Sequence, residues 1–146
     1  LGDVITWITE AIGISDGGKR RMITNSFLIS ADNAHGIHPN YESKADPTNQ
    51  PLLNGGIVLK FHGGQKYTSG YLRTLCKGAG VSCQSYHNRS DIAGGSTLGN
   101  ISTAHVSIPS VDIGLAQWAM HSAMETAGTK DLDALIRLCE HFYGVD

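Results

Sequence analysis

The chain has 146 residues, of which 40% are hydrophobic and 16% charged, and its formal net charge is −2. These values are typical of one globular domain with its own core, and they leave no electrostatic footprint for nucleic acid or an anionic membrane. No apolar run is long enough to span a bilayer, and no stretch has the pattern of a signal peptide. The cysteines Cys76, Cys83 and Cys139 form no CxxC pair, which favours free thiols in a reducing compartment.

The N-terminal part of the chain predicts one helix followed by one strand. Apolar residues recur at helical spacing in residues 3–14 (DVITWITEAIGI), which indicates a helix. The polar and glycine-rich residues 15–21 (SDGGKRR) are expected to form a loop. Residues 25–31 (NSFLISA) are continuously apolar or small, as in a buried strand, and they lead directly into Asp32.

The middle of the chain predicts a long loop, a second strand and a second helix. Residues 36–55 are rich in proline and asparagine, and an ordered connection of that length is usually functional. Residues 56–61 (GIVLKF) indicate a strand, and the turn at residues 62–65 (HGGQ) leads to a further short extended piece. Residues 67–78 predict a helix that is stopped by glycines.

The last part of the chain predicts two more strands and two more helices. Residues 81–86 indicate a strand, and the glycine-rich residues 91–99 (DIAGGSTLG) indicate a loop that leads into a short helix ending near His105. Residues 106–113 are expected to form another strand segment and residues 114–125 a loop. Residues 131–143 predict an amphipathic helix. Its inward-facing side chains are expected to be Leu132, Leu135, Ile136, Leu138 and Phe142.

Helices and strands therefore alternate along the chain, which predicts the α/β class with a mixed, mostly parallel sheet flanked by helices. In open α/β sheets, the loops at the carboxyl ends of the strands carry the chemistry. The polar residues that follow each predicted strand are therefore the candidate functional residues.

Asp32, His35 and His38 are spaced three apart immediately after the first predicted strand. A carboxylate at a strand end is a suitable ligand for zinc, and the histidines could add nitrogen ligands or orient the other ligands. Alternatively, Asp32 caps the following turn and the histidines satisfy backbone groups near Pro39. The spacing does not choose between these interpretations, because it matches no standard zinc motif.

Three further features of the sequence, namely His121, the loop at residues 94–99 and Lys60, can each be interpreted in two ways. His121 is either a surface or core residue or completes a site with Asp32. The loop GGSTLG at residues 94–99 is either a tight turn or presents N–H groups to an anion or a substrate carbonyl. Nucleotide binding is not expected there, because the loop lacks the Walker lysine and the GxGxxG pattern. Lys60, within an apolar strand, either lies at a sheet edge with its amine in solvent or binds an acidic ligand.

In order, the segments ISADNAHGIHPNY, LLNGGIVLKF, QKY, GGSTLG and AMHSAMET resemble the carboxyl-terminal part of the aspartyl aminopeptidase family. The resemblance covers nearly the whole chain from about Phe27 onward, and the first segment is its most specific motif. It implies that residues 1–146 are the C-terminal segment of a phosphorylase/hydrolase-like zinc-peptidase catalytic domain. Members of the family are metallo-aminopeptidases of the cytosol or vacuole with two zinc ions, and a cytoplasmic location is expected here.

The resemblance also implies roles for individual residues. Asp32 and His121 would each bind one of the two zinc ions, and Tyr67 would act in catalysis by holding the reacting carbonyl. The substrate-binding residues would be His35, Lys60, Gly95 and Ser96. Lys60 would face the acidic side chain of the first residue of the substrate.

The chain departs from the family pattern at two places. Ala93-Gly94-Gly95 stands where family members commonly have Pro-Cys-Gly, and Met124 stands where an arginine is common. In addition, the first metal-binding histidine of the family, its bridging aspartate and its adjacent glutamate pair lie upstream of the Asp32 motif. Nothing in residues 1–31 replaces them, so the chain is expected to hold one ligand for each zinc ion and to lack the general base.

The expected function is that of a dinuclear zinc aminopeptidase that removes N-terminal, acidic residues from short peptides. This chain would be the C-terminal part of that enzyme and would be inactive on its own. The same resemblance implies a large homo-oligomer, a tetrahedral dodecamer. The alternative is a non-catalytic α/β module that keeps the fold and the assembly surface. No nucleic-acid or membrane partner is expected.

Overall fold

A mixed four-stranded sheet lies at the centre of the computed structural model, which describes residues 1–61, 66–92, 94–95 and 98–144, with the backbone alone at 66, 67, 98 and 100. The strand order is β1-β5-β3-β4. The strands are β1 (Leu28–Ala31), β3 (Ile57–Lys60), β4 (Cys83–Tyr86) and β5 (Ser110–Gly114). β1 is parallel to β5 and β3 is parallel to β4, whereas β3 and β5 are antiparallel. The predicted mixed, mostly parallel sheet is therefore confirmed.

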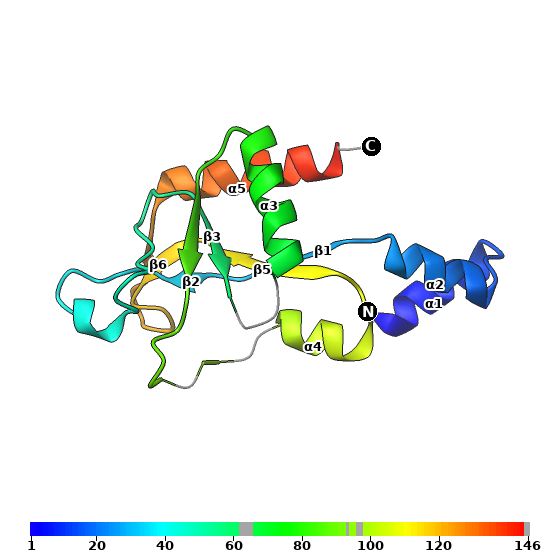
Figure 1. Ribbon diagram of the computed structural model, residues 1–146, viewed down its shortest axis with the longest axis horizontal. Helices are drawn as coiled ribbons and strands as arrows, with labels where there is room; N and C mark the ends of the chain where they lie inside the picture. Colours follow the sequence, from blue (N-terminus) through cyan, green and yellow to red (C-terminus); the bar gives the residue numbers. More distant parts are fainter. Residues whose placement is uncertain (62–65, 93, 96–97, 145–146) are drawn as a thin grey trace.

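Helices cover both faces of the sheet (Figure 1). α3 (Lys66–Gly78) and α5 (Thr129–Tyr143) lie on one face, and α4 (Leu98–His105) lies on the other, against β5. These three helices agree with the predicted ones. No helix within the described ranges is long and apolar enough to cross a bilayer.

A smaller sheet continues from the ends of β1 and β5. It consists of β2 (Ala34–His35), β6 (Ala116–Trp118) and β7 (Thr126–Ala127), in the order β2-β6-β7. β6 lies in a segment that was expected to be a loop, and it forms because β2 offers a parallel partner directly after β1. The connection between β2 and β3 is the predicted long loop, with one 3-10 turn, η1 (Glu42–Lys44). The turn expected at residues 62–65 lies outside the described residues.

The two faces of the main sheet differ in chemistry because successive side chains of a strand point to opposite sides. One set of side chains packs under α3 and α5 and forms the hydrophobic core. Its buried members are Ile57, Leu59, Leu72, Leu75, Cys76, Val111, Ile113, Leu115, Ala134 and Leu138. The alternate residues Ser30 and Asp112 face α4, where a Cβ on Gly99 would lie 3.0 Å from the Ser30 Oγ. The sheet therefore has one apolar face and one face with a polar centre.

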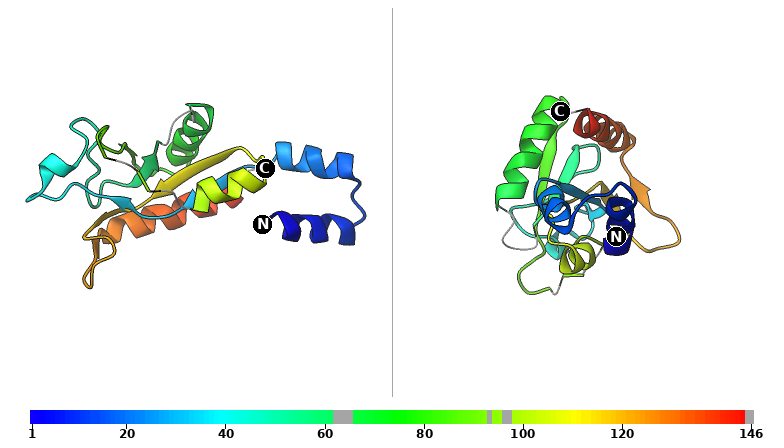
Figure 2. Two further views of the ribbon diagram at one scale, coloured as in Figure 1. Left: turned by 90° about the horizontal axis from the view of Figure 1, so that it is seen from below. Right: turned by 90° about the vertical axis from the view of Figure 1, so that its right-hand side faces the viewer.

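The N-terminal segment is a hairpin of two helices that projects from the sheet (Figure 2). α1 (Gly2–Ala11) was predicted, whereas α2 (Asp16–Thr24) replaces an expected loop. The Ser15 Oγ caps α2 by accepting a hydrogen bond from the Gly18 N–H at 3.2 Å, and the Lys19 Nζ donates to the Thr6 Oγ1 of α1 at 2.5 Å. These contacts outweigh the low helix propensity of two glycines, about 1 kcal/mol each.

The rotation of α5 about its axis differs from the prediction. Leu132 and Ile136 were expected to face inward, yet they are 55% and 51% exposed. The buried face is instead centred on Asp131, which is fully buried, and it continues through Leu138. Hydrogen bonds of Asp131 to the backbone before β3 determine this rotation, because they require the carboxylate to point into the protein.

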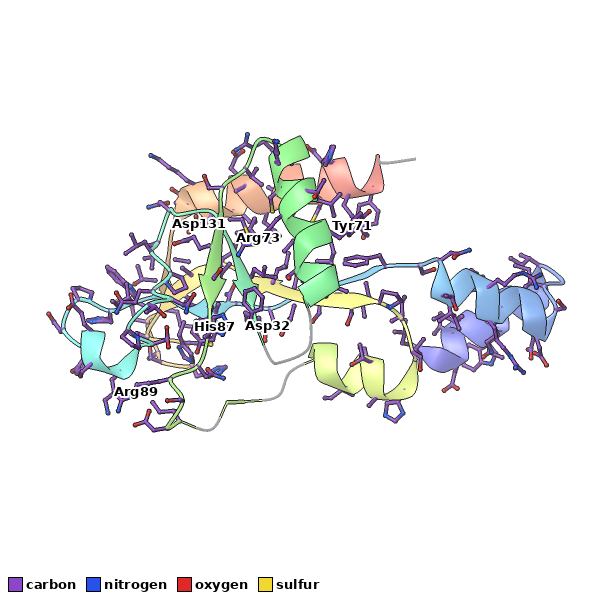
Figure 3. All side chains as sticks on the ribbon, in the orientation of Figure 1. Asp32, Tyr71, Arg73, His87, Arg89 and Asp131 are labelled. Atoms are coloured by element: carbon purple, nitrogen blue, oxygen red, sulfur yellow. The ribbon has the colours of Figure 1, made fainter. Side chains whose placement is uncertain are left out.

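We expect Asp131→Ala to lower the free energy of unfolding by about 3 kcal/mol, because two donors lose a buried charged acceptor. The Asp131 carboxylate, at the start of α5 in Figure 3, accepts from the Asn54 N–H at 2.7 Å and from the Gly56 N–H at 2.8 Å. Asn54 and Gly56 both have positive φ, so these bonds also hold a strained turn. Urea unfolding measures the loss. The exposed Asp133→Ala on the same helix is the control, and an equal loss in both variants would contradict the prediction.

Candidate functional site

A pocket of about 780 Å³ opens on the face of the sheet opposite the hydrophobic core. Its wall is formed by the segments that follow β1, β4 and β6. Five of the predicted site residues line it: Asp32, His35, Lys60, Gly95 and His121. In Figure 3, Asp32 and a further lining residue, His87, lie below the ends of β3 and β4. A pocket of this size accommodates a small ligand or a short peptide end.

Strand register brings the charged centre of this pocket together. In β5, Asp112 pairs with Ser30 of β1 on one side and with Lys60 of β3 on the other. Asp32 follows Ser30 by two residues, so the alternation of side chains directs it to the same face. The Lys60 Nζ consequently lies 3.4 Å from the Asp112 Oδ2 and 3.6 Å from the Asp32 Oδ2. Residues far apart in the sequence thus form one charged trio.

Burial distinguishes the two carboxylates of the trio. Asp112 is 5% exposed, whereas the Asp32 side chain is 40% exposed. A buried ammonium requires a counter-charge, and Asp112 supplies it inside the sheet. Asp32 reaches the pocket, and the trio keeps one net negative charge. Asp32 is therefore the member that can bind a cation from the pocket.

The position of Lys60 in the sheet excludes one of the two interpretations that the sequence allows for this residue. It lies on β3, which has β5 on one side and β4 on the other, and it is 4% exposed. The interpretation of an edge position with the amine in solvent is wrong. Both ion-pair distances exceed the 2.7–2.9 Å of a direct charge-assisted hydrogen bond, so the ammonium retains donor capacity toward the pocket.

His121 lies at the pocket in a tight, strained turn. Its φ is 68° and that of Ala119 is 55°, in the left-handed region that non-glycine residues rarely adopt. The Glu125 Oε1 holds the turn by accepting a hydrogen bond from the His121 N–H at 2.5 Å, and the Ser122 Oγ donates to the Met124 carbonyl at 2.8 Å. Strain of this kind persists where the surroundings enforce it, often at functional sites.

His38 has the role of ordering the turn after β2. Its Nδ1 accepts a hydrogen bond from the Asn40 N–H at 3.1 Å, and its ring lies between Tyr41 and Trp118, with centroids 5.2 and 5.3 Å away. The Trp118 Nε1 donates to the Ile37 carbonyl at 2.7 Å, which fixes this wall. His35 precedes the turn as the last residue of β2 and is exposed at the pocket.

The sequence-based reasoning missed several residues that lie in the wall of the pocket or behind it. Asp112 carries the same signal as Lys60, a charge within an apolar strand segment. His87 follows the strand predicted at residues 81–86, and its ring stacks on Phe61 at a centroid distance of 4.6 Å and an angle of 5°. Arg89 donates to the Ser43 carbonyl and pairs with Asp91, which joins two loops of the wall. A polar residue directly after a strand is the signal for His87, and a charged residue within an apolar strand is the signal for Asp112.

The long loop contributes an acidic residue with a lowered pKa to the wall. Hydrogen bonds from the Asn49 and Thr48 side chains, together with their backbone N–H groups, lower the pKa of Asp46 to about 2. In contrast, burial raises the pKa of Tyr86, whose hydroxyl donates to the Asn88 Oδ1 at 2.6 Å. Asp46 is therefore anionic at neutral pH, and Tyr86 is neutral there.

The two predicted metal ligands, Asp32 and His121, do not make up a metal site by themselves. Among the residues that the structure describes, no three His, Cys, Asp or Glu side chains group so that they could hold a metal ion. Asp32 and His121 offer the carboxylate and imidazole that zinc accepts, and a closed zinc site needs about four ligands. These residues fit a zinc site in part. The side chain of Tyr67 and all of Ser96 lie outside the described residues, so their roles stay predictions.

Solved structures share this fold. Aminopeptidase I from Clostridium acetobutylicum matches with a TM-score of 0.79 at 22% identity, over 91% of this chain and 31% of that chain. A chain in the cryo-EM structure of the Ape4 and Nbr1 complex matches with a TM-score of 0.78 at 35% identity, over 83% of this chain and 24% of that chain. The S. cerevisiae mApe1 dodecamer matches with a TM-score of 0.74 at 24% identity, over 83% of this chain and 27% of that chain.

Sequence relatives agree with these structures. A probable M18 family aminopeptidase 2 from Pseudomonas savastanoi pv. phaseolicola is 49% identical over 97% of this chain, and one from Pseudomonas aeruginosa (strain UCBPP-PA14) is 47% identical over 84%. The chain spans about one third of the length of these relatives, 34% and 30%. The model of the family described as aminopeptidase I zinc metalloprotease (M18) matches residues 1–143. The chain therefore belongs to the M18 family of zinc aminopeptidases.

Proposed function

We propose that residues 1–146 form the C-terminal segment of the catalytic domain of a dinuclear zinc aminopeptidase that removes N-terminal, acidic residues from peptides. The main support for this proposal is that Asp32, Lys60 and His121 line the same pocket. It joins an exposed carboxylate and an imidazole, both suited to zinc, with a buried ammonium suited to an acidic side chain. Family membership supplies the class of reaction.

In this proposal each residue of the pocket has a separate task. Asp32 and His121 each bind one zinc ion, with ligands from the rest of the protein completing both sites. Bound zinc supplies a water molecule of lowered pKa and polarises the carbonyl of the first peptide bond. Tyr67 holds that carbonyl, while His35, Gly95 and Ser96 contact the substrate.

Lys60 would select an acidic first residue. Its ammonium faces the pocket and is already desolvated. Binding of a substrate carboxylate therefore requires little further desolvation of the ammonium. Asp112 keeps Lys60 positioned without occupying the pocket, because it is buried behind it. We propose further that the enzyme is cytoplasmic and acts as a large homo-oligomer. The dodecamer of S. cerevisiae mApe1, which shares the fold, supports the oligomer.

The test compares the chain alone with a chimera in which the upstream two thirds of the Pseudomonas savastanoi relative precede it. We expect the chimera to release nitroaniline from aspartyl p-nitroanilide in a zinc-dependent manner, about 10-fold faster than from the asparaginyl analogue, which corresponds to one lost charge-assisted contact. The chain alone should be inactive, because its described residues hold no group of three metal ligands.

Two outcomes would contradict the proposal. Robust hydrolysis by the chain alone would show that it contains a whole site. A folded, oligomeric chimera that binds zinc without hydrolysing any anilide would instead support the non-catalytic module. Circular dichroism and gel filtration of the chimera distinguish such a module from a misfolded protein.

A further inference from the structure

The end of α3 places Cys76 beside the segment that leads into β4. α3 ends in a Schellman cap, in which the Val81 N–H donates to the Cys76 carbonyl at 2.9 Å and the Gly80 N–H donates to the Lys77 carbonyl at 3.2 Å. Gly80 has the positive φ of 65° that this cap requires. The chain therefore reverses, and Val81 packs back against the core cluster that contains Cys76.

The following strand brings Cys83 to the same place. The segment after Val81 pairs directly with β3. The Ile57 N–H donates to the Ser82 carbonyl at 2.9 Å, and Ile57 lies opposite Cys83. In an extended segment, residues two apart share a side, so Cys83 follows Val81 onto the core cluster. Cys76 is a buried member of that cluster, and Cys83 packs against it. The cap of α3 and the alternation of side chains along the extended segment therefore bring the two cysteines to the same part of the core.

The two thiols differ in exposure and acidity. Cys76 is 2% exposed, whereas Cys83 is half-buried. The nearby Cys76 thiol and the positive charge of Arg73 lower the pKa of Cys83 to about 7, whereas the nearby Cys83 thiol and burial raise the pKa of Cys76. Arg73 is held beside β4, because its Nη2 donates to the Ser85 Oγ at 2.8 Å (Figure 3). Cys83 is therefore the accessible, nucleophilic thiol of the pair.

We propose that Cys76 and Cys83 are a modification site that a small disulfide such as glutathione disulfide converts reversibly into an intramolecular disulfide. The Cys83 thiolate attacks one sulfur of glutathione disulfide, the S–S bond of that molecule breaks, and one glutathione thiolate leaves. The Cys76 sulfur then attacks the Cys83 sulfur of the mixed disulfide. The second glutathione leaves and takes up the Cys76 proton. Two thiols are oxidised and one glutathione disulfide is reduced, so atoms and electrons balance.

Trypsin makes the crosslink directly visible, because Lys77 lies between the two cysteines. Cleavage separates residues 74–77, with Cys76, from residues 78–89, with Cys83, while Cys139 falls in a third peptide. The intact protein is incubated with glutathione disulfide, blocked with iodoacetamide and digested. We expect the first two peptides to be joined and to separate on treatment with dithiothreitol, while Cys139 is alkylated or carries glutathione.

Single variants test the order of the steps. Cys76→Ser should accumulate glutathione on Cys83, whereas Cys83→Ser should carry none on the buried Cys76. Cys139→Ser should form the crosslink at the rate of the unmodified protein. Unlinked, alkylated peptides from the unmodified protein would overturn the proposal, as would a glutathione adduct on Cys83 that Cys76 does not resolve. Peptide mapping of the unmodified protein tests the proposal even if one of the variants fails to fold.

Discussion

Replacing Asp32 with asparagine in the chimera with the upstream part of the Pseudomonas savastanoi relative is expected to lower its kcat at least about 100-fold, since even the loss of a group that only orients a metal ligand costs 10–100-fold. Asparagine has nearly the same size as aspartate but no negative charge, and it is a poor zinc ligand. The fold should persist, because the Asp32 side chain is 40% exposed and Lys60 keeps Asp112 as its counter-ion.

The measurement pairs activity with metal content and stability. Hydrolysis of aspartyl p-nitroanilide, zinc per protomer and the urea midpoint are determined for Asp32→Asn and for the control Asp133→Asn. Asp133 is an exposed acid on α5, so the Asp133→Asn chimera should match the unsubstituted chimera in all three values. Full activity with full zinc content in Asp32→Asn would remove Asp32 from the ligand set.

The second large effect concerns the buried charge at the centre of the sheet. Lys60→Met is expected to lower the free energy of unfolding by about 3–5 kcal/mol, the usual loss when one partner of a buried ion pair is removed. The reason is the Asp112 carboxylate, which is 5% exposed and would remain in the sheet without the ammonium 3.4 Å away. Urea unfolding of the variant gives the value.

A double-mutant cycle tests whether that loss arises from the negative charge of Asp112 that remains after Lys60 is replaced. Lys60→Met combined with Asp112→Asn removes both charges, and we expect it to recover at least about half of the loss of the single Lys60 variant. Losses that simply add would show that Lys60 and Asp112 contribute independently. That outcome would also weaken the role of Asp112 as the group that positions Lys60.

Elements with a strong local pattern were predictable from the sequence. α1, α3, α4 and α5 appear where apolar periodicity and glycine stops indicate helices, and β1, β3 and β4 lie within the expected strands. Local patterns did not predict the elements whose formation or orientation depends on contacts with another part of the chain. α2 depends on contact with α1, and β6 depends on β2. The rotation of α5 depends on the backbone donors that Asp131 meets before β3, some 75 residues away.

The sequence by itself determined the family, the α/β class and most of the candidate residues, because the Asp32 motif and the segments after it are local and specific. Only the tertiary structure decided how Lys60 is satisfied, that Asp112 belongs to the site, and that Asp32 rather than Asp112 faces the pocket. These facts follow from strand order and register, which bring residues 32, 60 and 112 onto one face of the sheet. Register is set by long-range backbone pairing and packing, and no local pattern contains it.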